Sequence, residues 1–139
     1  MRAAVTASRV LVDGSASAAV LYLAEPLSFW GGFDAETGAI TDVHHPQHGT
    51  TVTGTVLVMP SGRGSSSSSS VLAEAIRART APAAIVLAEA DPIVALGAIV
   101  ADELYGVTVP VVVVDDERAF REVASFGSAS IEGDTIHEA

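Results

Sequence analysis

Three short aliphatic runs in the second half of the chain constrain its fold most. They cover residues 55–59, 83–88 and 109–114, and the last is nearly all β-branched apart from one proline near its start. Short runs without polar alternation are typical of strands buried on both faces of a sheet. Because helical patterns separate the runs, this half predicts an α/β arrangement in which strands and helices alternate.

Two of the separating segments carry clear helix signals. Residues 71–76 place four apolar side chains on one helical face. The serines that precede them, residues 65–70, therefore open a helix. Farther along, Asp91 is a capping carboxylate and Pro92 suits a first helical position, so a second helix is predicted from there to about Leu104.

The end of the chain predicts two more short elements. Asp115 or Asp116 is expected to cap a short helix that has Phe120 on its inner side. Residues 128–131 predict a final strand. The residues after it, 133–139, predict a polar tail.

The first half has no helix signal. Residues 10–12 and 18–23 predict two strands joined by a tight turn at residues 13–15. Residues 26–54 are rich in Gly, Pro, His, Asp and Thr without hydrophobic periodicity, and predict a long loop with one short strand near Ile40. An ordered loop of this length is unusual in a small domain without a binding role, which makes the segment a site candidate.

The composition narrows the class of protein. The chain has 139 residues, 49% of them hydrophobic, with 7 Lys and Arg against 17 Asp and Glu for a formal net charge of −10. These values predict one compact domain over residues 1–139 and disfavour nucleic acid and anionic membranes as partners. Because the first half adds a layer of strands and loops to the α/β half, a β/β/α arrangement is predicted for this domain. No apolar run approaches the about 18 residues that span a bilayer, and no secretory signal pattern opens the chain, so a cytoplasmic location is expected.

The strongest local signal for chemistry lies between the first aliphatic run and the serine-opened helix. There the chain reads Pro-Ser-Gly-Arg-Gly and then six serines. Glycines allow a tight turn, the first N–H groups of a helix carry partial positive charge, and Arg63 can grip a carboxylate or phosphate. The segment therefore predicts a site for a small anionic substrate.

The same segment has several other possible interpretations. A Walker A loop needs a lysine after its second glycine, and a hydrolase nucleophile elbow needs Gly-x-Ser-x-Gly, and neither pattern occurs here. A low-complexity flexible linker is the plain alternative, but its place between a strand and an amphipathic helix argues against it. A non-catalytic binding or regulatory module that holds an anion stays open.

A histidine cluster and an aromatic pair are two further candidates for a functional site. His44, His45 and His48 lie near Asp42, but a proline and a glycine among them argue against a helix, so polar loop histidines are favoured over metal ligands. The chain has no cysteine, which excludes an iron–sulfur cluster held by its own thiolates. For the aromatic pair within residues 28–32, a core plug or interface and a pocket wall stay equally open.

Four segments together resemble the aconitase X small subunit. They are Pro-Leu-Ser-Phe-Trp-Gly-Gly at 26–32, His-Pro-Gln-His-Gly at 45–49, Gly-Arg-Gly-Ser-Ser-Ser-Ser-Ser at 62–69 and Ala-Pro-Ala-Ala-Ile-Val at 81–86. The resemblance covers nearly the whole chain. It implies a swivelling β/β/α domain like the C-terminal domain of aconitase, and a large-subunit partner that carries most substrate ligands and an iron or iron–sulfur centre.

The resemblance also implies roles for the serine segment. In the wider aconitase superfamily a Gly-Ser-Ser run supplies a serine that removes the proton α to a carboxylate, and the matching residue is Ser65. Arg63, Gly64, Ser66 and Ser67 are then candidate substrate contacts, and no residue of this chain is a metal ligand. Donors at the helix start are suited to stabilise a serine alkoxide.

Two substrates are associated with this family. Bacterial members dehydrate cis-3-hydroxy-L-proline and archaeal members dehydrate mevalonate 5-phosphate. The serine-rich loop resembles the bacterial type, whereas archaeal sequences tend to have Gly-Ser-Thr-Val-Gly at this place. The resemblance therefore implies a hydro-lyase subunit acting on cis-3-hydroxy-L-proline, with mevalonate 5-phosphate as the alternative substrate.

Overall fold

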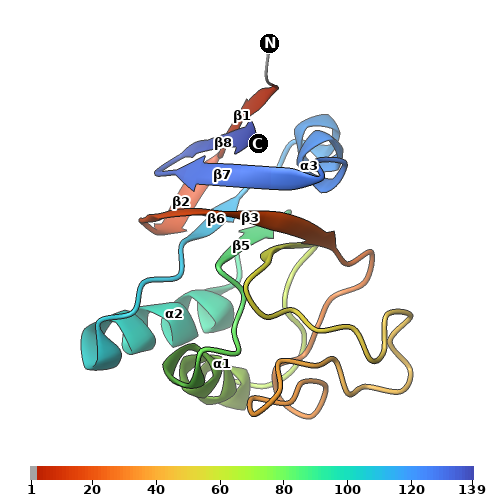
Figure 1. Cartoon of the computed structure of the whole chain (residues 1–139), viewed down its shortest axis with the longest axis vertical. Coiled ribbons are helices and arrows are strands. Elements are labelled where there is room, and N and C mark those ends of the chain that lie inside the picture. Colours follow the sequence, from red (N-terminus) through yellow and green to blue (C-terminus); the bar gives the residue numbers. More distant parts are fainter. Residues whose placement is uncertain (1–2) are drawn as a thin grey trace.

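A computed structural model describes residues 3–139, which form a curled sheet with helices on its two sides (Figure 1). The elements in chain order are β1 (Ala4–Thr6), β2 (Arg9–Val12), β3 (Ser15–Tyr22), β4 (Val56–Met59), α1 (Ser67–Ala78), β5 (Ala84–Leu87), α2 (Pro92–Tyr105), β6 (Val111–Val113), α3 (Glu117–Ala124), β7 (Ser128–Glu132) and β8 (Thr135–Glu138). The sheet order is β1-β8-β7-β3-β4-β5-β6-β2. Strands β3 to β6 are parallel neighbours, and the pairs on either side of them are antiparallel. This mixed sheet confirms the predicted α/β class.

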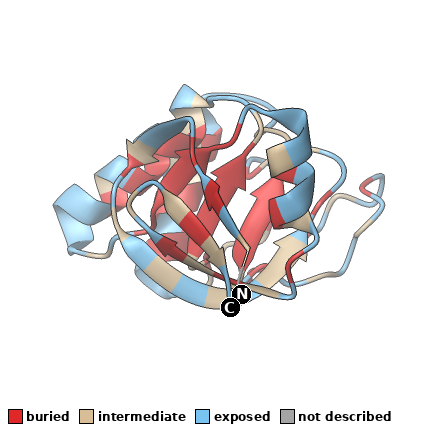
Figure 2. Ribbon diagram, turned by 90° about the horizontal axis from the view of Figure 1, so that it is seen from above, coloured by how far each residue is buried: buried red, intermediate tan, exposed pale blue. Residues whose placement is uncertain are grey.

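The three aliphatic runs form the parallel strands β4, β5 and β6, and every residue in these strands is buried. Alternate side chains point to opposite faces of a strand. On β4, Leu57 and Met59 join a core with α1, α2 and the long loop, whereas Val56 and Val58 join a second core with α3, β7 and β8. Figure 2 shows this buried centre surrounded by exposed helices and loops. The sheet is therefore the middle layer between two cores.

The first two predicted strands are present, but the prediction that they pair across a tight turn is wrong. β2 pairs with β6, and β3 pairs with β4 and β7. Four strand spacings separate β2 from β3 in the sheet order, about 19 Å if the sheet were flat. The three Cα steps between Val12 and Ser15 span at most about 11 Å. The sheet must curl to bring these strands together, which the local sequence does not reveal.

The predicted polar tail is also wrong, because residues 135–138 form β8. This strand pairs on one side with β7 and on the other with β1, a short strand that the sequence did not single out. Ile136 is its only large apolar side chain, and it is fully buried. A strand with one buried anchor and polar neighbours has too weak a hydrophobic pattern to be recognised without its partners.

The predicted helices form as expected. α2 begins at Pro92 with Asp91 as its N-cap and ends at Tyr105, and Asp116 caps α3 by accepting a hydrogen bond from the Ala119 N–H at 2.9 Å. The serine run opens α1, whose helical residues begin at Ser67. Each of these starts follows from side-chain or backbone signals that are local in sequence.

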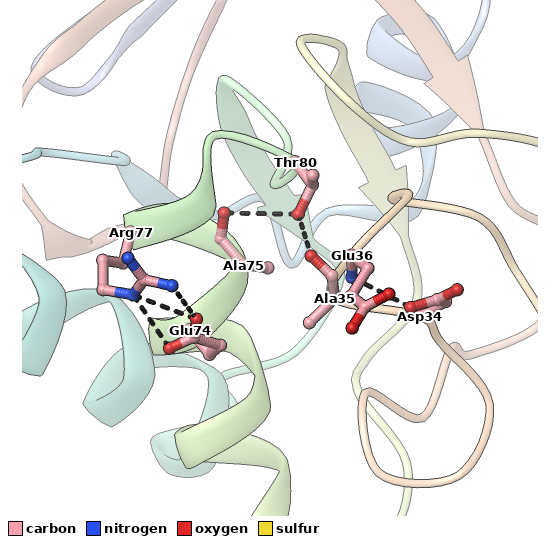
Figure 3. A network of polar contacts seen from close by, with 7 residues as sticks. All are labelled: Asp34, Ala35, Glu36, Glu74, Ala75, Arg77 and Thr80. Carbon is pink, nitrogen blue, oxygen red and sulfur yellow. Dashed lines mark hydrogen bonds and ion pairs between the residues drawn. The ribbon is translucent and has the colours of Figure 1, made fainter.

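The long loop between β3 and β4 is ordered by the core and by the end of α1. In place of the strand predicted near Ile40, that residue forms only an isolated bridge with Phe33. Thr80, just beyond α1, donates a hydrogen bond from Oγ1 to the Ala35 carbonyl at 2.6 Å (Figure 3). Five apolar side chains of the loop are buried against α1, α2 and the sheet: Leu27, Phe29, Phe33, Ile40 and Val52. The loop is thus part of the fold, with no need of regular secondary structure.

Candidate functional site

In the segment between β4 and α1, Gly62 forms an isolated parallel bridge with Leu27, and its backbone passes close to the start of α2. The Gly62 N–H donates to Asp91 Oδ2 at 3.0 Å. A Cβ atom at Gly62 would lie 2.6 Å from that oxygen and 2.9 Å from Val94 Cγ2. Both distances are too short, so a side chain at this position would force the Asp91 and Val94 side chains at the start of α2 to move.

Gly64 has a different constraint, because its φ of +104° is a conformation that residues with a side chain rarely adopt. A Cβ atom there would also lie 2.7 Å from Ser28 Oγ, in the long loop. Together the two glycines bring Arg63 and Ser65 between α1, α2 and the long loop.

Ser65 lies at the open N-terminus of α1. Its Oγ accepts a hydrogen bond from the Ser67 N–H at 3.3 Å, and its carbonyl accepts one from the Ser68 N–H at 3.0 Å. Ser66 occupies the N-cap position without a side-chain capping bond, and the first turn has no acidic residue. The partial positive charge of the helix end therefore acts directly on the Ser65 hydroxyl.

A small cavity of about 50 Å³ adjoins Ser65. It is lined by Leu27, Phe29, Gly62, Arg63, Gly64, Ser65, Ser68, Asp91, Ile93 and Val94. Three of the predicted site residues, Arg63, Gly64 and Ser65, are thus brought together. Ser66 and Ser67 are exposed beside the cavity and do not line it.

Arg63 is held loosely. One guanidinium nitrogen lies 4.0 Å from Glu25 Oε1, and both side chains are 53% exposed. An exposed ion pair at this distance contributes little to stability. The Arg63 guanidinium is therefore free to exchange Glu25 for another anion.

Asp91 lines the same cavity but is fully engaged in structure. Oδ1 accepts hydrogen bonds from the Ile93 and Val94 N–H groups at 3.0 and 3.2 Å, while Oδ2 holds Gly62. These bonds confirm the predicted N-cap. They also compensate the negative charge of a carboxylate beside an anion site.

Sequence reasoning missed Ser68, which is the only member of the serine run classed as buried, with 5% of its surface exposed. It lines the cavity, and its Oγ accepts a hydrogen bond from the Trp30 N–H at 3.2 Å. A signal was available, because Ser68 lies four residues before Leu72 and so falls on the buried helical face.

The aromatic pair has two separate roles. Phe29 is 1% exposed and packs edge-to-face on Phe33, with ring centroids 5.1 Å apart, and it also lines the cavity. Trp30 is 59% exposed. Phe29 is therefore both core plug and cavity wall, while the Trp30 side chain is left at the surface.

The histidine cluster does not form a metal site. His45 is 4% exposed, its Nε2 lies 3.2 Å from the Glu25 carbonyl oxygen, and its Nδ1 accepts from the Gln47 N–H at 3.0 Å. Because Nδ1 accepts, Nε2 is the nitrogen that donates to the Glu25 carbonyl, and the ring ties the long loop to the end of β3. His45 is thus a buried structural residue, which its polar surroundings in sequence did not suggest.

Residues 3–139 hold no group of three or more His, Asp or Glu side chains that could bind a metal ion. With no cysteine in the sequence, the residues present do not fit an iron or iron–sulfur centre. No step of a reaction is therefore derived through a metal held by this chain. Within the same described range, no helix combines the length and apolar character needed to cross a membrane.

The pattern of the family described as the aconitase X swivel domain matches residues 5–138. The chain belongs to this family. The match confirms the resemblance and, with the solved structure below, the predicted swivel-domain fold.

Known relatives extend this comparison. The crystal structure of Thermococcus kodakaraensis aconitase X (holo-form) superimposes with a TM-score of 0.83 at 32% identity, over 99% of this chain and 98% of that one. A Pseudomonas aeruginosa protein named cis-3-hydroxy-L-proline dehydratase is 48% identical over 118 residues, which is 85% of this chain and 20% of that protein. A Methanothermobacter thermautotrophicus protein named phosphomevalonate dehydratase small subunit is 46% identical over 93 residues, 67% of this chain and 71% of that protein. The chain thus spans a fifth of the first curated relative.

Proposed function

We propose that this chain is the small subunit of an aconitase X-type hydro-lyase that dehydrates a small hydroxy acid, with Ser65 as the base. The observation that carries the proposal is the position of Ser65 Oγ at the open end of α1, where it accepts the Ser67 N–H. The names of the two curated relatives, both dehydratases, support the reaction class.

In the proposed reaction, the Ser65 alkoxide removes the proton from the carbon that bears the substrate carboxylate. The electron pair of that C–H bond forms a double bond to the neighbouring carbon, whose hydroxyl group leaves and becomes water by taking up a proton. A serine hydroxyl is a weak base because its conjugate alkoxide is unstable in water. Donors aimed at the alkoxide in a site closed to water would offset this instability.

The chain offers such donors from its backbone. Besides the Ser67 N–H, the amides of Gly64, Ser65 and Ser66 donate no hydrogen bond to another group within residues 3–139. Arg63 adds a positive charge that can contact the substrate carboxylate. Ser66 and Ser67 stay candidate contacts through their exposed hydroxyl groups.

A large subunit is the proposed partner, and it would supply the iron or iron–sulfur centre and the remaining substrate ligands. Two observations support a partner. The cavity of about 50 Å³ is too small for a whole substrate, and Ser65 is exposed, so another surface must cover it to exclude water. The P. aeruginosa relative, of which this chain matches only a fifth, is consistent with such a covering part.

We assign cis-3-hydroxy-L-proline as the preferred substrate and mevalonate 5-phosphate as the alternative. The identity to the P. aeruginosa relative extends over 85% of the chain, whereas the identity to the small subunit from M. thermautotrophicus extends over 67%. The broader match favours the amino acid substrate.

The test is a dehydration assay of this chain, of its cognate large subunit and of the two mixed, with both substrates in parallel. Activity on cis-3-hydroxy-L-proline only in the mixture is expected. Activity on mevalonate 5-phosphate alone would replace the substrate but keep the reaction. A stable complex that is inactive on both, together with anion binding by the isolated chain in calorimetry, would favour the non-catalytic module.

A further inference from the structure

We propose that Ser68 donates a hydrogen bond to the carboxylate of the substrate inside the cavity beside Ser65. This inference rests on the proposed function and adds a substrate contact to it. Its starting point is a buried hydroxyl group whose proton has no acceptor in the fold.

A serine hydroxyl can donate one hydrogen bond and accept others. Ser68 Oγ accepts the Trp30 N–H at 3.2 Å, but within residues 3–139 it donates to no acceptor. Its neighbour Ser69 behaves as helical serines commonly do and donates back to the Ser66 carbonyl at 2.8 Å. The Ser68 proton is therefore available to a ligand, although the side chain is only 5% exposed.

The cavity limits what this proton can reach. Ser68 lines it together with Gly64, Ser65 and Arg63. Its volume of about 50 Å³ leaves room for about four water molecules, enough for a carboxylate group but not for the whole ring of hydroxyproline. The substrate would thus insert its carboxylate here, with its ring facing the partner subunit.

Charge at the cavity is compatible with this placement. The one carboxylate among the lining residues, Asp91, already accepts three N–H groups, and Arg63 contributes a positive charge on the open side. The Trp30 N–H occupies one lone pair of Ser68 Oγ, so the hydroxyl proton is left to point away from that N–H.

The test uses the complex with the large subunit and compares Ser68→Ala and Ser68→Cys with a matched control, Ser28→Ala. Ser28 Oγ donates to the Trp30 carbonyl at 2.7 Å, so the control loosens the same loop without touching Ser68. Ser68→Cys keeps the side chain near its native size and retains a weak acceptor for Trp30 if the alanine variant folds poorly.

Loss of a hydrogen bond to a charged group predicts that Ser68→Ala raises KM for cis-3-hydroxy-L-proline by about 10- to 100-fold, with a smaller change in kcat. L-proline and L-prolinamide, used as competitive inhibitors, give a second readout. Ser68→Ala and Ser68→Cys should weaken inhibition by the acid about tenfold more than inhibition by the amide. Ser28→Ala should leave both inhibitors and KM near wild-type values.

Equal weakening of both inhibitors, or the same change in Ser28→Ala as in Ser68→Ala, would mean a structural role and overturn the inference. Wild-type KM in Ser68→Ala would overturn it as well. In both cases the wild-type complex remains active, so the proposed function survives. A wild-type complex that does not dehydrate hydroxyproline overturns the proposed function first and this contact with it.

Discussion

The N-termini of α1 and α2 border the same cavity, yet they end in opposite ways. α2 is closed by the Asp91 carboxylate, which accepts two N–H groups of its own helix, and by Pro92, which has no N–H to leave unpaired. α1 begins with serines, its N-cap Ser66 makes no side-chain capping bond, and its first turn has no acidic residue. The start of α2 is capped by a side chain of its own, whereas the N–H groups of Gly64, Ser65 and Ser66 before α1 have no acceptor within residues 3–139.

The two helix starts lie far apart in the sequence, at Ser66 and Asp91, yet they meet at one cavity, one with a capping carboxylate and one without. A carboxylate at the start of α1 would stabilise that helix but would occupy the donors that the proposed reaction needs. Natural helix ends rarely forgo a capping bond where nothing else is gained. If the proposed site is correct, stability is given up for binding at the start of α1, while Asp91 caps the neighbouring start of α2.

Removing the Ser65 hydroxyl group at the start of α1 should have the largest effect on activity. In the complex with the large subunit, Ser65→Ala is expected to lower kcat by about 100- to 10,000-fold, the usual range for loss of a general base. Ser65 is exposed, so the unfolding midpoint and the affinity for the large subunit should change little. Steady-state kinetics and size-exclusion chromatography of the complex measure these effects, and undiminished turnover in the variant contradicts the assignment of Ser65 as the base.

Removing the N-cap of α2 should lower stability instead of activity. Asp91→Ala removes the cap of α2 and leaves the Gly62 N–H without its acceptor, for a combined loss of about 2–4 kcal/mol in the free energy of unfolding. Asp91→Asn, which keeps one carbonyl oxygen, should lose less. Urea unfolding monitored by circular dichroism gives both values. Equal stability of wild type and Asp91→Ala would mean that the cap does not hold the turn.

Adding a capping carboxylate to the start of α1 tests whether that helix end then behaves like the start of α2. Ser66→Asp places a negative charge at the start of α1 and should raise the free energy of unfolding by about 0.3–1 kcal/mol. The same charge competes with the substrate anion for the helix donors, so KM should rise about tenfold, the change that 1.4 kcal/mol produces. Ser70→Asp, exposed one turn farther along, is the matched control. If both variants bind substrate alike, the charge at the helix end does not govern binding.

Much of the fold could be predicted because its signals are local. The buried strands β4, β5 and β6 and the capped start of α2 depend on residues that are neighbours in sequence. The pairing of β2 and the strand character of β8 could not be predicted, since both depend on partners far along the chain. Ladder hydrogen bonds between distant segments leave little trace in a single sequence.

The candidate site also has a part that the sequence predicted and a part that it did not. The glycines and the helix start indicated an anion site, and Arg63, Gly64 and Ser65 do line one cavity. Six identical serines do not by themselves tell which hydroxyl group faces inward, and the spacing of four residues to Leu72, which distinguishes Ser68, was not used. The roles of Ser65 and its neighbours, and the exclusion of nucleic acid and membranes as partners, stay predictions.

A change of charge in the C-terminal half of α1 should have the smallest effect on stability and no effect on kinetics. Arg77 donates to both carboxylate oxygens of Glu74, and this hydrogen bonding lowers the pKa of Glu74 while it raises that of Arg77 (Figure 3).

A lowered pKa in the folded state means that the pair stabilises the fold above the unfolded pKa of Glu74 and loses this contribution as the pH falls through its folded pKa. Both side chains are about half exposed, so Glu74→Gln should shift the unfolding midpoint slightly at pH 7, not at all in strong acid, and leave kcat and KM unchanged. Thermal unfolding of wild type and Glu74→Gln from pH 7 to strong acid measures the shift in midpoint, and kinetics at pH 7 measures kcat and KM. A change in KM comparable to that of Ser66→Asp would show that charge anywhere on α1 reaches the substrate, and the contrast between the two helix ends would then lose its functional meaning.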